Sequence, residues 1–326
     1  NTVEAINAML AGQAKVFIGL GGNFAQATPD SPRTHAALQQ CELTAQISTK
    51  LNRSHLMHGR QALILPCLGR TDIDRQAHGP QAVTVEDSFS MVHASKGQLA
   101  PLSPQMRSEP AIIAGIAHAL LGRQPVDWLW LIEDYTRIRE LIADTLPGFA
   151  DFNQRLEQPG GFYLGNAAGA RRWDTHGGKA RFIAHKLPEH LLPAEVRSQA
   201  EKPHLVLQTL RSHDQYNTTL YGLDDRYRGV YGMREVLFVN ALDIQRLGFA
   251  AGQKVDVVSL WDDGIERRVK GFTLLAYDTP AGQAAAYYPE TNPLVPLASF
   301  GAGSHTPTSK FIAIRLLPAS ADQRIH

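Results

Sequence analysis

The chain has 326 residues, of which 44% are hydrophobic and 19% are charged, and this ordinary globular composition excludes a disordered tail. Its 32 Lys and Arg residues nearly balance 31 Asp and Glu residues, so no strongly basic face is expected for duplex DNA and we predict no nucleic-acid partner. The length predicts two domains with a small insert.

The two cysteines, Cys41 and Cys67, are too few for a disulfide framework or for a cysteine-based zinc or iron–sulfur site within this chain. Such usage fits a reducing compartment, and we expect a cytoplasmic protein. No apolar run approaches the ~20 residues of a membrane span, so no membrane partner is expected. The first ten residues lack the features of a signal peptide and predict a helix instead.

The first half of the chain alternates between helix and strand patterns. In chain order, these patterns predict a helix over 1–10, a strand over 14–23, a helix over 31–42, a strand over 43–49, a buried strand over 62–69, a strand over 82–90, a helix over 108–122 and a long amphipathic helix over 127–146. This alternation predicts an α/β fold with an open, mostly parallel sheet covered by helices. Near residue 150 the sequence becomes Gly-rich, and from Leu205 onward it is mostly β.

Two loops follow predicted strands of the first half. The turn "GLGGN" (19–23) is rich in glycine, which allows backbone N–H groups to approach a ligand closely, and "STKLNRSH" (48–55) follows the next strand. Because ligands of open α/β sheets bind at the carboxyl ends of the strands, both loops could face one crevice. A tight turn and a polar surface loop are the alternatives. The missing GxGxxG spacing and the lack of an acidic ribose partner disfavour a NAD site.

Other reactive side chains give weaker signals. His55 and His58 have the spacing of half a metal site, but no third ligand has clear spacing, and we predict no metal ligands. Both cysteines are interpreted as inert, and we predict no catalytic residue. The pairs Arg171–Arg172 and Arg267–Arg268 are interpreted as solvated faces, and 262–264 as a turn.

The most unusual stretch is "LRSHDQYNTTLYGLDDRYRG" (210–229), which follows the buried run 205–207 and contains almost nothing apolar. Arg211 can bind a phosphate or carboxylate bidentately, and Gln and Asn can pair with a heterocycle edge that offers both donors and acceptors. This inventory suits a nucleotide-like or pterin-like ligand. A structural polar network explains the same residues equally well.

Several segments, in order, resemble the molybdopterin oxidoreductase family, specifically the formate-dehydrogenase-like alpha subunits of the YdeP type. The segments that resemble the family's C-terminal dinucleotide-binding barrel are "TLRSHDQYNTTLYGLDDRYRG", "VLFVNALDIQRLGFAAGQKVDVVS", "TNPLVP" and "TPTSKFIAIRL". Those that resemble the later part of its Rossmann-like domain are "VFIGLGGNFAQATPD", "STKLNRSHL", "ALILPCLGRTDID" and "VTVEDSFSMVHAS".

The resemblance implies a Rossmann-like domain over 1–155, a connecting hairpin segment over 156–200, and a double-psi β-barrel of the aspartate-decarboxylase and formate-dehydrogenase C-terminal type over 201–326. It implies bis-molybdopterin guanine dinucleotide, with molybdenum or tungsten, as cofactor. One guanine end would lie against Gly21, Gly22, Asn23, Ser48, Thr49 and Lys50. The pterin and phosphates would lie against Arg211, Ser212, Gln215, Tyr216, Asn217 and Thr218, with Asn292 and Lys310 completing the barrel side.

By the same resemblance, the chain is the C-terminal portion of a longer subunit. N-terminal domains of that subunit would supply the metal-side residues and a 4Fe–4S cluster, and the chain alone would be inactive. The parent protein would act on a small molecule such as formate and transfer electrons to a partner. Two alternatives remain: a stand-alone barrel that recognises a protein or nucleotide ligand, and an independent nucleotide-dependent enzyme, which the missing glycine fingerprint disfavours.

Overall fold

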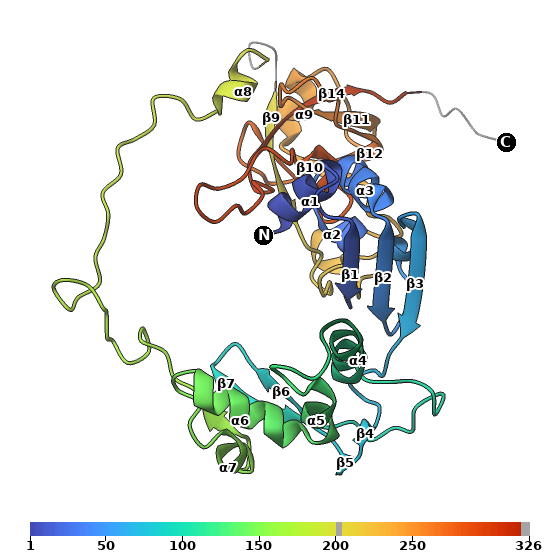
Figure 1. Cartoon of the computed structure of the whole chain (residues 1–326). Coiled ribbons are helices and arrows are strands. Elements are labelled where there is room, and N and C mark those ends of the chain that lie inside the picture. Colours follow the sequence, from blue (N-terminus) through green and yellow to red (C-terminus); the bar gives the residue numbers. More distant parts are fainter. Residues whose placement is uncertain (200–203, 321–326) are drawn as a thin grey trace. The chain divides into compact units, whose positions relative to one another are not determined.

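The computed structural model describes residues 1–199 and 204–320 (Figure 1). The chain forms two compact units. The first comprises Asn1–Gln46, Leu51–Ile64 and Pro188–His326, and the second comprises Ile47–Lys50 and Leu65–Leu187. The predicted boundary between the connecting segment and the barrel domain, at residues 200 and 201, lies outside the described ranges.

The N-terminal part alternates helices and strands as predicted. Its elements are α1 (Thr2–Leu10), β1 (Val16–Leu20), α2 (Phe24–Ala27), α3 (Ser31–Gln40), β2 (Leu43–Ser48), the 3-10 helix η1 (Arg53–Leu56) and β3 (Gln61–Pro66). The strands form a three-stranded sheet in the order β1-β2-β3, and their arrows point the same way in Figure 1. This confirms the parallel sheet.

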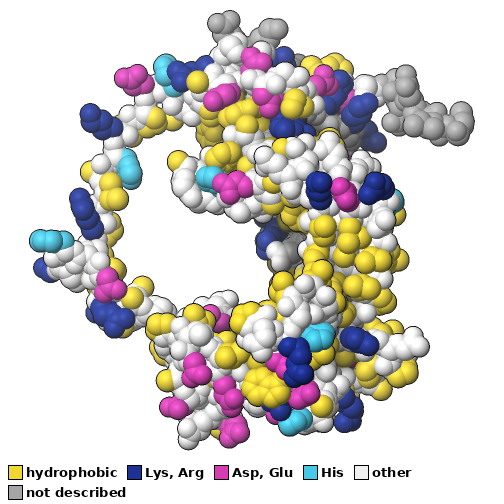
Figure 2. All heavy atoms as spheres, viewed as in Figure 1, with side chains coloured by type: hydrophobic (Ala, Val, Ile, Leu, Met, Phe, Trp, Pro, Cys, Tyr) yellow, Lys and Arg dark blue, Asp and Glu magenta, His cyan; other side chains and the backbone are white. Residues whose placement is uncertain are grey.

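The predicted burial of the run 62–69 is wrong for most of β3. Leu63 and Ile64 are 48% and 50% exposed, because β3 is an edge strand of a sheet with only three strands. β1, the opposite edge strand, also exposes Val16, Ile18 and Leu20, and Figure 2 shows hydrophobic side chains gathered over this sheet.

The second unit contains a separate antiparallel sheet. Its elements are β4 (Arg75–Gln76), β5 (Gly79–Pro80), β6 (Val83–Glu86), β7 (Met91–Ser95), α4 (Glu109–Leu121), α5 (Trp128–Glu133), α6 (Tyr135–Thr145), α7 (Phe152–Leu156) and β8 (Phe162–Tyr163). β6, β7 and β8 pair antiparallel, and Val92, Phe152 and Phe162 form a core beside them. The expected strand over 82–90 is therefore shorter than predicted and does not join the parallel sheet.

The long helix predicted over 127–146 is two helices. Asp134 ends α5 with an extended backbone (φ −150°), and its carboxylate caps α6 by accepting a hydrogen bond from the Thr136 N–H (2.9 Å). An aspartate at this position competes with the helix by satisfying backbone donors outside it. The apolar spacing continues across the break, which is why the sequence pattern concealed it.

The C-terminal part forms a closed six-stranded barrel. Its strands are β9 (Leu205–Leu210), β10 (Val236–Val239), β11 (Lys254–Ser259), β12 (Arg268–Ala276), β13 (Gln283–Tyr287) and β14 (Ile312–Pro318), in the order β10-β12-β11-β14-β9-β13. The pairs β10/β12 and β9/β13 are parallel and the others are antiparallel. The helix α8 (Ala194–Arg197) precedes the barrel, and short helical segments lie between its strands: η2 (Arg226–Arg228), α9 (Ala241–Arg246) and η3 (Asn292–Leu294).

The barrel interior is apolar, since alternate residues of each strand point inward. Leu205, Leu207, Val255, Val257 and Ile314 are among the residues of this core. The mixed α/β fold with a β-rich second half is thus confirmed. No helix in the ranges that the structure describes has the length and apolar content that a bilayer crossing requires.

Within the first unit, the N-terminal helices attach to the barrel through a buried ion pair. Arg267 and Asp30 are both 1% exposed and lie 2.8 Å apart, and Asp263 makes a second pair with Arg267 at 2.8 Å. The interpretation of Arg267 as part of a solvated face is therefore wrong, because its counter-ion comes from a distant part of the chain. Arg268 also has a buried partner, Asp256, at 2.6 Å.

Candidate functional site

The polar loop that follows β9 has an inner and an outer side. Ser212 and Thr218 are buried, whereas Arg211, Tyr216 and Asn217 are exposed. The buried residues of this loop therefore fit a structural polar network, and its exposed residues fit a surface that faces a ligand.

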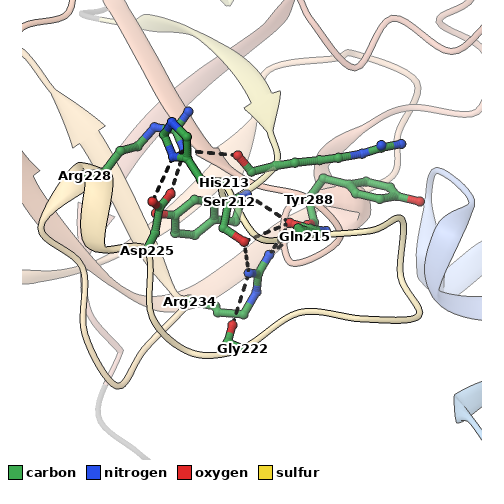
Figure 3. Close-up of polar contacts among 10 residues, drawn as sticks. Ser212, His213, Gln215, Gly222, Asp225, Arg228, Arg234 and Tyr288 are labelled. Atoms are coloured by element: carbon green, nitrogen blue, oxygen red, sulfur yellow. Dashed lines mark hydrogen bonds and ion pairs between the residues drawn. The ribbon is translucent and has the colours of Figure 1, made fainter.

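Gln215 belongs to the inner side, and all of its amide groups have protein partners (Figure 3). Its Oε1 accepts hydrogen bonds from the Ser212 N–H (3.1 Å) and from Arg234 (3.0 Å). Its Nε2 donates to the carbonyl oxygens of Asn217 (2.8 Å) and Tyr288 (2.7 Å). The side chain consequently fixes the loop and has little capacity left for a ligand.

Arg234 is the central residue of this inner network and was not identified from the sequence. It is 3% exposed, pairs with Glu290 at 2.7 Å, and donates to Ser212 Oγ at 3.1 Å. Its guanidinium lies between the rings of Tyr221 (4.3 Å) and Tyr287 (4.8 Å), which adds cation–π attraction. No local pattern marked this arginine as buried, because Glu290 is 56 residues away in the chain.

The outer side presents two cations. Arg211 Nη2 donates to Asn217 Oδ1 (2.7 Å), and Asn217 adopts a left-handed backbone (φ 49°) that turns the loop back. Lys310 donates to the Thr209 carbonyl, and its pKa is lowered by burial and by the nearby charge of Arg211. Neither Arg211 nor Lys310 pairs with a carboxylate of the described residues. Two neighbouring cations without a counter-ion suit an anionic ligand.

The glycine turn after β1 is hydrogen-bonded to the loop after β2. Gly21 and Gly22 both have positive φ (65° and 67°), and nothing lies within 4 Å of a Cβ built on Gly22. Asn52 donates to the Gly22 carbonyl (2.7 Å), and Ser54 Oγ donates to Asn23 Oδ1 (3.2 Å). The expected grouping of these two loops at one end of the sheet is thus present for Gly22, Asn23 and Asn52.

Ser48, Thr49 and Lys50, at the end of β2, form a turn of their own in which Ser48 Oγ donates to the Lys50 carbonyl (2.7 Å). Thr49 and Lys50 are exposed. Asn292, in contrast, is buried at the contact between α2 and the barrel, where its Nδ2 donates to the Gln26 carbonyl (2.8 Å). Asn292 therefore does not share the exposed outer side with Arg211.

The remaining candidates have protein partners or are buried. His55 Nδ1 accepts a hydrogen bond from the Asn52 N–H (3.0 Å), and no group of three or more metal-binding side chains occurs within residues 1–199 and 204–320. Cys41 and Cys67 are both buried, and burial together with Glu109 raises the pKa of Cys67 to about 11. Thiols with raised pKa values are poor nucleophiles.

The fold and this loop together define a mixed α/β protein whose closed barrel carries a polar, cationic surface. No family model matches the chain. The chain is 54% identical over 326 residues to an uncharacterized oxidoreductase of Mycobacterium tuberculosis, and 46% identical over 320 residues to protein YdeP of Escherichia coli. These matches cover 98% of this chain but 41% and 42% of the two relatives, so the chain spans about two fifths of their length.

Among solved structures, the chain has the fold of part of acetylene hydratase from Pelobacter acetylenicus. The TM-score is 0.59 at 12% sequence identity, and the similarity covers 98% of this chain and 46% of that chain. At this level of identity the comparison concerns the fold alone.

Proposed function

We propose that this chain is the cofactor-binding portion of a longer molybdopterin-dependent oxidoreductase. The resemblance of its motifs to that family supports the proposal, as does the relative named an oxidoreductase at 54% identity. The single observation that carries it is the pair of cations, Arg211 and Lys310, on the outer side of the barrel loop without a carboxylate partner among the residues described.

The donor set fits the proposed cofactor, bis-molybdopterin guanine dinucleotide. Its phosphates need cations and N–H donors, which Arg211 and Lys310 offer, and Asn217 holds the Arg211 guanidinium at 2.7 Å. When bound, the cofactor and its molybdenum or tungsten would supply the redox chemistry, while the protein binds and orients it. Gln215 and Arg234 would act indirectly, by fixing the loop that carries these groups.

The finer parts of the proposal concern the parent protein. We infer that the closed barrel is of the double-psi type and that N-terminal domains of the same subunit carry the metal-side residues and a 4Fe–4S cluster. The substrate class would be a small molecule such as formate, with a separate electron-transfer partner, in the cytoplasm. Each of these extends the family resemblance.

The test is to purify the longer polypeptide that contains this chain and to measure its metal and its guanine content. Arg211→Ala should lower both together, because a charge-assisted hydrogen bond of about 1.5–3 kcal/mol is lost, which is about 10- to 150-fold in affinity. Arg60→Ala is a suitable control, since Arg60 is 75% exposed and pairs with Glu42 at 3.7 Å. A polypeptide without metal and guanine would refute the proposal. If such a polypeptide bound a peptide or a nucleotide, the alternative of a stand-alone barrel that recognises a protein or nucleotide ligand would be favoured.

A further inference from the structure

A second polar cluster on the barrel is built around one buried carboxylate (Figure 3). Asp225 is 2% exposed. Its Oδ1 lies 3.0 Å from His213 Nδ1, and its Oδ2 accepts hydrogen bonds from Arg228 (2.6 Å) and Tyr287 (2.9 Å). None of these residues is among those assigned above to the proposed cofactor site.

The contacts of Nδ1 favour one tautomer of His213. Arg228 Nη1 lies 3.3 Å from Nδ1, but its two hydrogens have closer acceptors in Asp225 Oδ2 and the Arg211 carbonyl, which leaves Asp225 Oδ1 as the partner of Nδ1. Burial alone would raise the pKa of Asp225, but hydrogen bonds from Arg228, His213 and Tyr287 outweigh it, so the pKa lies below its ordinary value. An ionised carboxylate can only accept hydrogen bonds. The proton of the neutral imidazole is therefore on Nδ1, and Nε2 carries the lone pair.

His213 presents this lone pair on the outer side of the loop. The side chain is 44% exposed, its ring packs on that of Tyr227 (4.5 Å between centroids), and Nε2 has no hydrogen-bond partner in the part of the chain that is described. Arg211 and His213 are both exposed while Ser212 between them is buried. Two residues of chain span at most about 7 Å, so the two side chains start close together.

The same cluster couples the imidazole to the loop backbone. Arg228 Nη1, which pairs with Asp225, also donates to the Arg211 carbonyl (3.1 Å). On the outer side Arg211 and Lys310 offer only donors, and Asn217 Oδ1 already accepts from Arg211. The N–H edge of a heterocycle needs acceptors, and His213 Nε2 can provide one beside the exposed carboxylate of Asp214. A carboxylate behind an imidazole orients the ring and holds its tautomer.

We propose that His213 and Asp225 form an acceptor site for a ring N–H or amino group of a phosphorylated heterocycle whose phosphate binds Arg211. This inference rests on the proposed function and names a recognition element within it. His213 makes the contact, and Asp225 is a positioning residue that holds the ring and its tautomer.

The experiment compares two mononucleotides as probes of the chain by calorimetric titration. GMP carries ring N–H and amino donors, whereas purine riboside 5′-monophosphate has the same sugar and phosphate but lacks them. GMP should bind about tenfold more tightly, as expected for one hydrogen bond of ordinary net strength. In His213→Asn, the amide N–H replaces Nδ1–H toward Asp225 while Nε2 is removed, so the preference for GMP should disappear and the affinity for the purine nucleotide should not change.

Two further readouts separate recognition from a structural role. Nitrogen NMR of the histidine-labelled chain should show Nε2 of His213 without a proton, and a protonated Nε2 in the neutral ring would overturn the inference. His213→Asn should unfold at the wild-type temperature, whereas His213→Ala should unfold earlier.

Equal binding of both nucleotides by the wild type would also overturn the inference, but the proposed function would stand if Arg211→Ala still weakened both. Binding of neither nucleotide would reject the acceptor site, and the metal and guanine content of the longer polypeptide would then decide the proposed function separately.

Discussion

Replacing Arg267 by Met should destabilise the first unit strongly. The side chain is 1% exposed and pairs at 2.8 Å with Asp30, which is also 1% exposed. Methionine has roughly the volume of the arginine side chain but carries no charge. The buried Asp30 carboxylate would keep its hydrogen bond from the Leu297 N–H (3.1 Å) and lose its counter-ion. Removing one member of a buried ion pair costs about 3–5 kcal/mol. For a unit of this size, each kcal/mol lowers the midpoint of thermal unfolding by about 2–4 °C.

The assay is urea unfolding combined with hydrogen exchange measured on peptides that contain Asp30 or Arg267. Both peptides should lose protection together, because the ion pair joins α3 to the barrel. Arg60→Met is the matched control in the same unit, and its exposed pair with Glu42 predicts a loss below about 1 kcal/mol. The double variant Asp30→Asn, Arg267→Met should be less destabilised than Arg267→Met alone, since the buried charge of Asp30 is removed and only the partly exposed Asp263 carboxylate loses its partner. Equal losses for Arg267→Met and Arg60→Met would refute the reasoning.

Two further predictions concern Asp256 and Gln215. Burial alone would raise the pKa of Asp256, but hydrogen bonds from Ser320, the Gly271 N–H and Arg268 outweigh it and lower the pKa to about 2. A lowered pKa stabilises the fold above the unfolded value of about 4, so about 2 kcal/mol should be lost as the pH falls from 4 to 2, and Asp256→Asn should flatten this dependence in urea titrations. Gln215→Leu leaves the Tyr288 carbonyl and Arg234 with fewer partners, and should cost about 1–3 kcal/mol with faster hydrogen exchange across 211–218. Unchanged exchange there would contradict the role of Gln215 as the residue that fixes the loop.

Local signals predicted individual helices well. The helix expected over 108–122 is α4, where the Ser108 hydroxyl accepts a hydrogen bond from the Ala111 N–H (3.4 Å), as a capping serine should. Capping and periodicity are properties of neighbouring residues, so the sequence displays them directly. The exposure of Leu63 was not predictable, because it depends on how many strands flank β3 and not on β3 itself.

The candidate site was predictable as a segment but not side chain by side chain. The polarity of 210–229 identified the loop, yet it did not distinguish outward-facing Arg211 from inward-facing Gln215. The direction of Gln215 is set by Arg234 and Tyr288, which are 19 and 73 residues away. Such partners become known only when the barrel strands are placed beside one another.

The strand order of the barrel also constrains when the protein can fold during its synthesis. β9, the first barrel strand, pairs with β13 and with β14, the last one. The barrel therefore cannot close until Ile312–Pro318 has been synthesised. Asp30 likewise has no counter-ion until Arg267, 237 residues downstream, has been synthesised. A ribosome that stalls early would release a chain with open strand edges and an unpaired carboxylate, which is a substrate for chaperones and proteases rather than a shorter working protein.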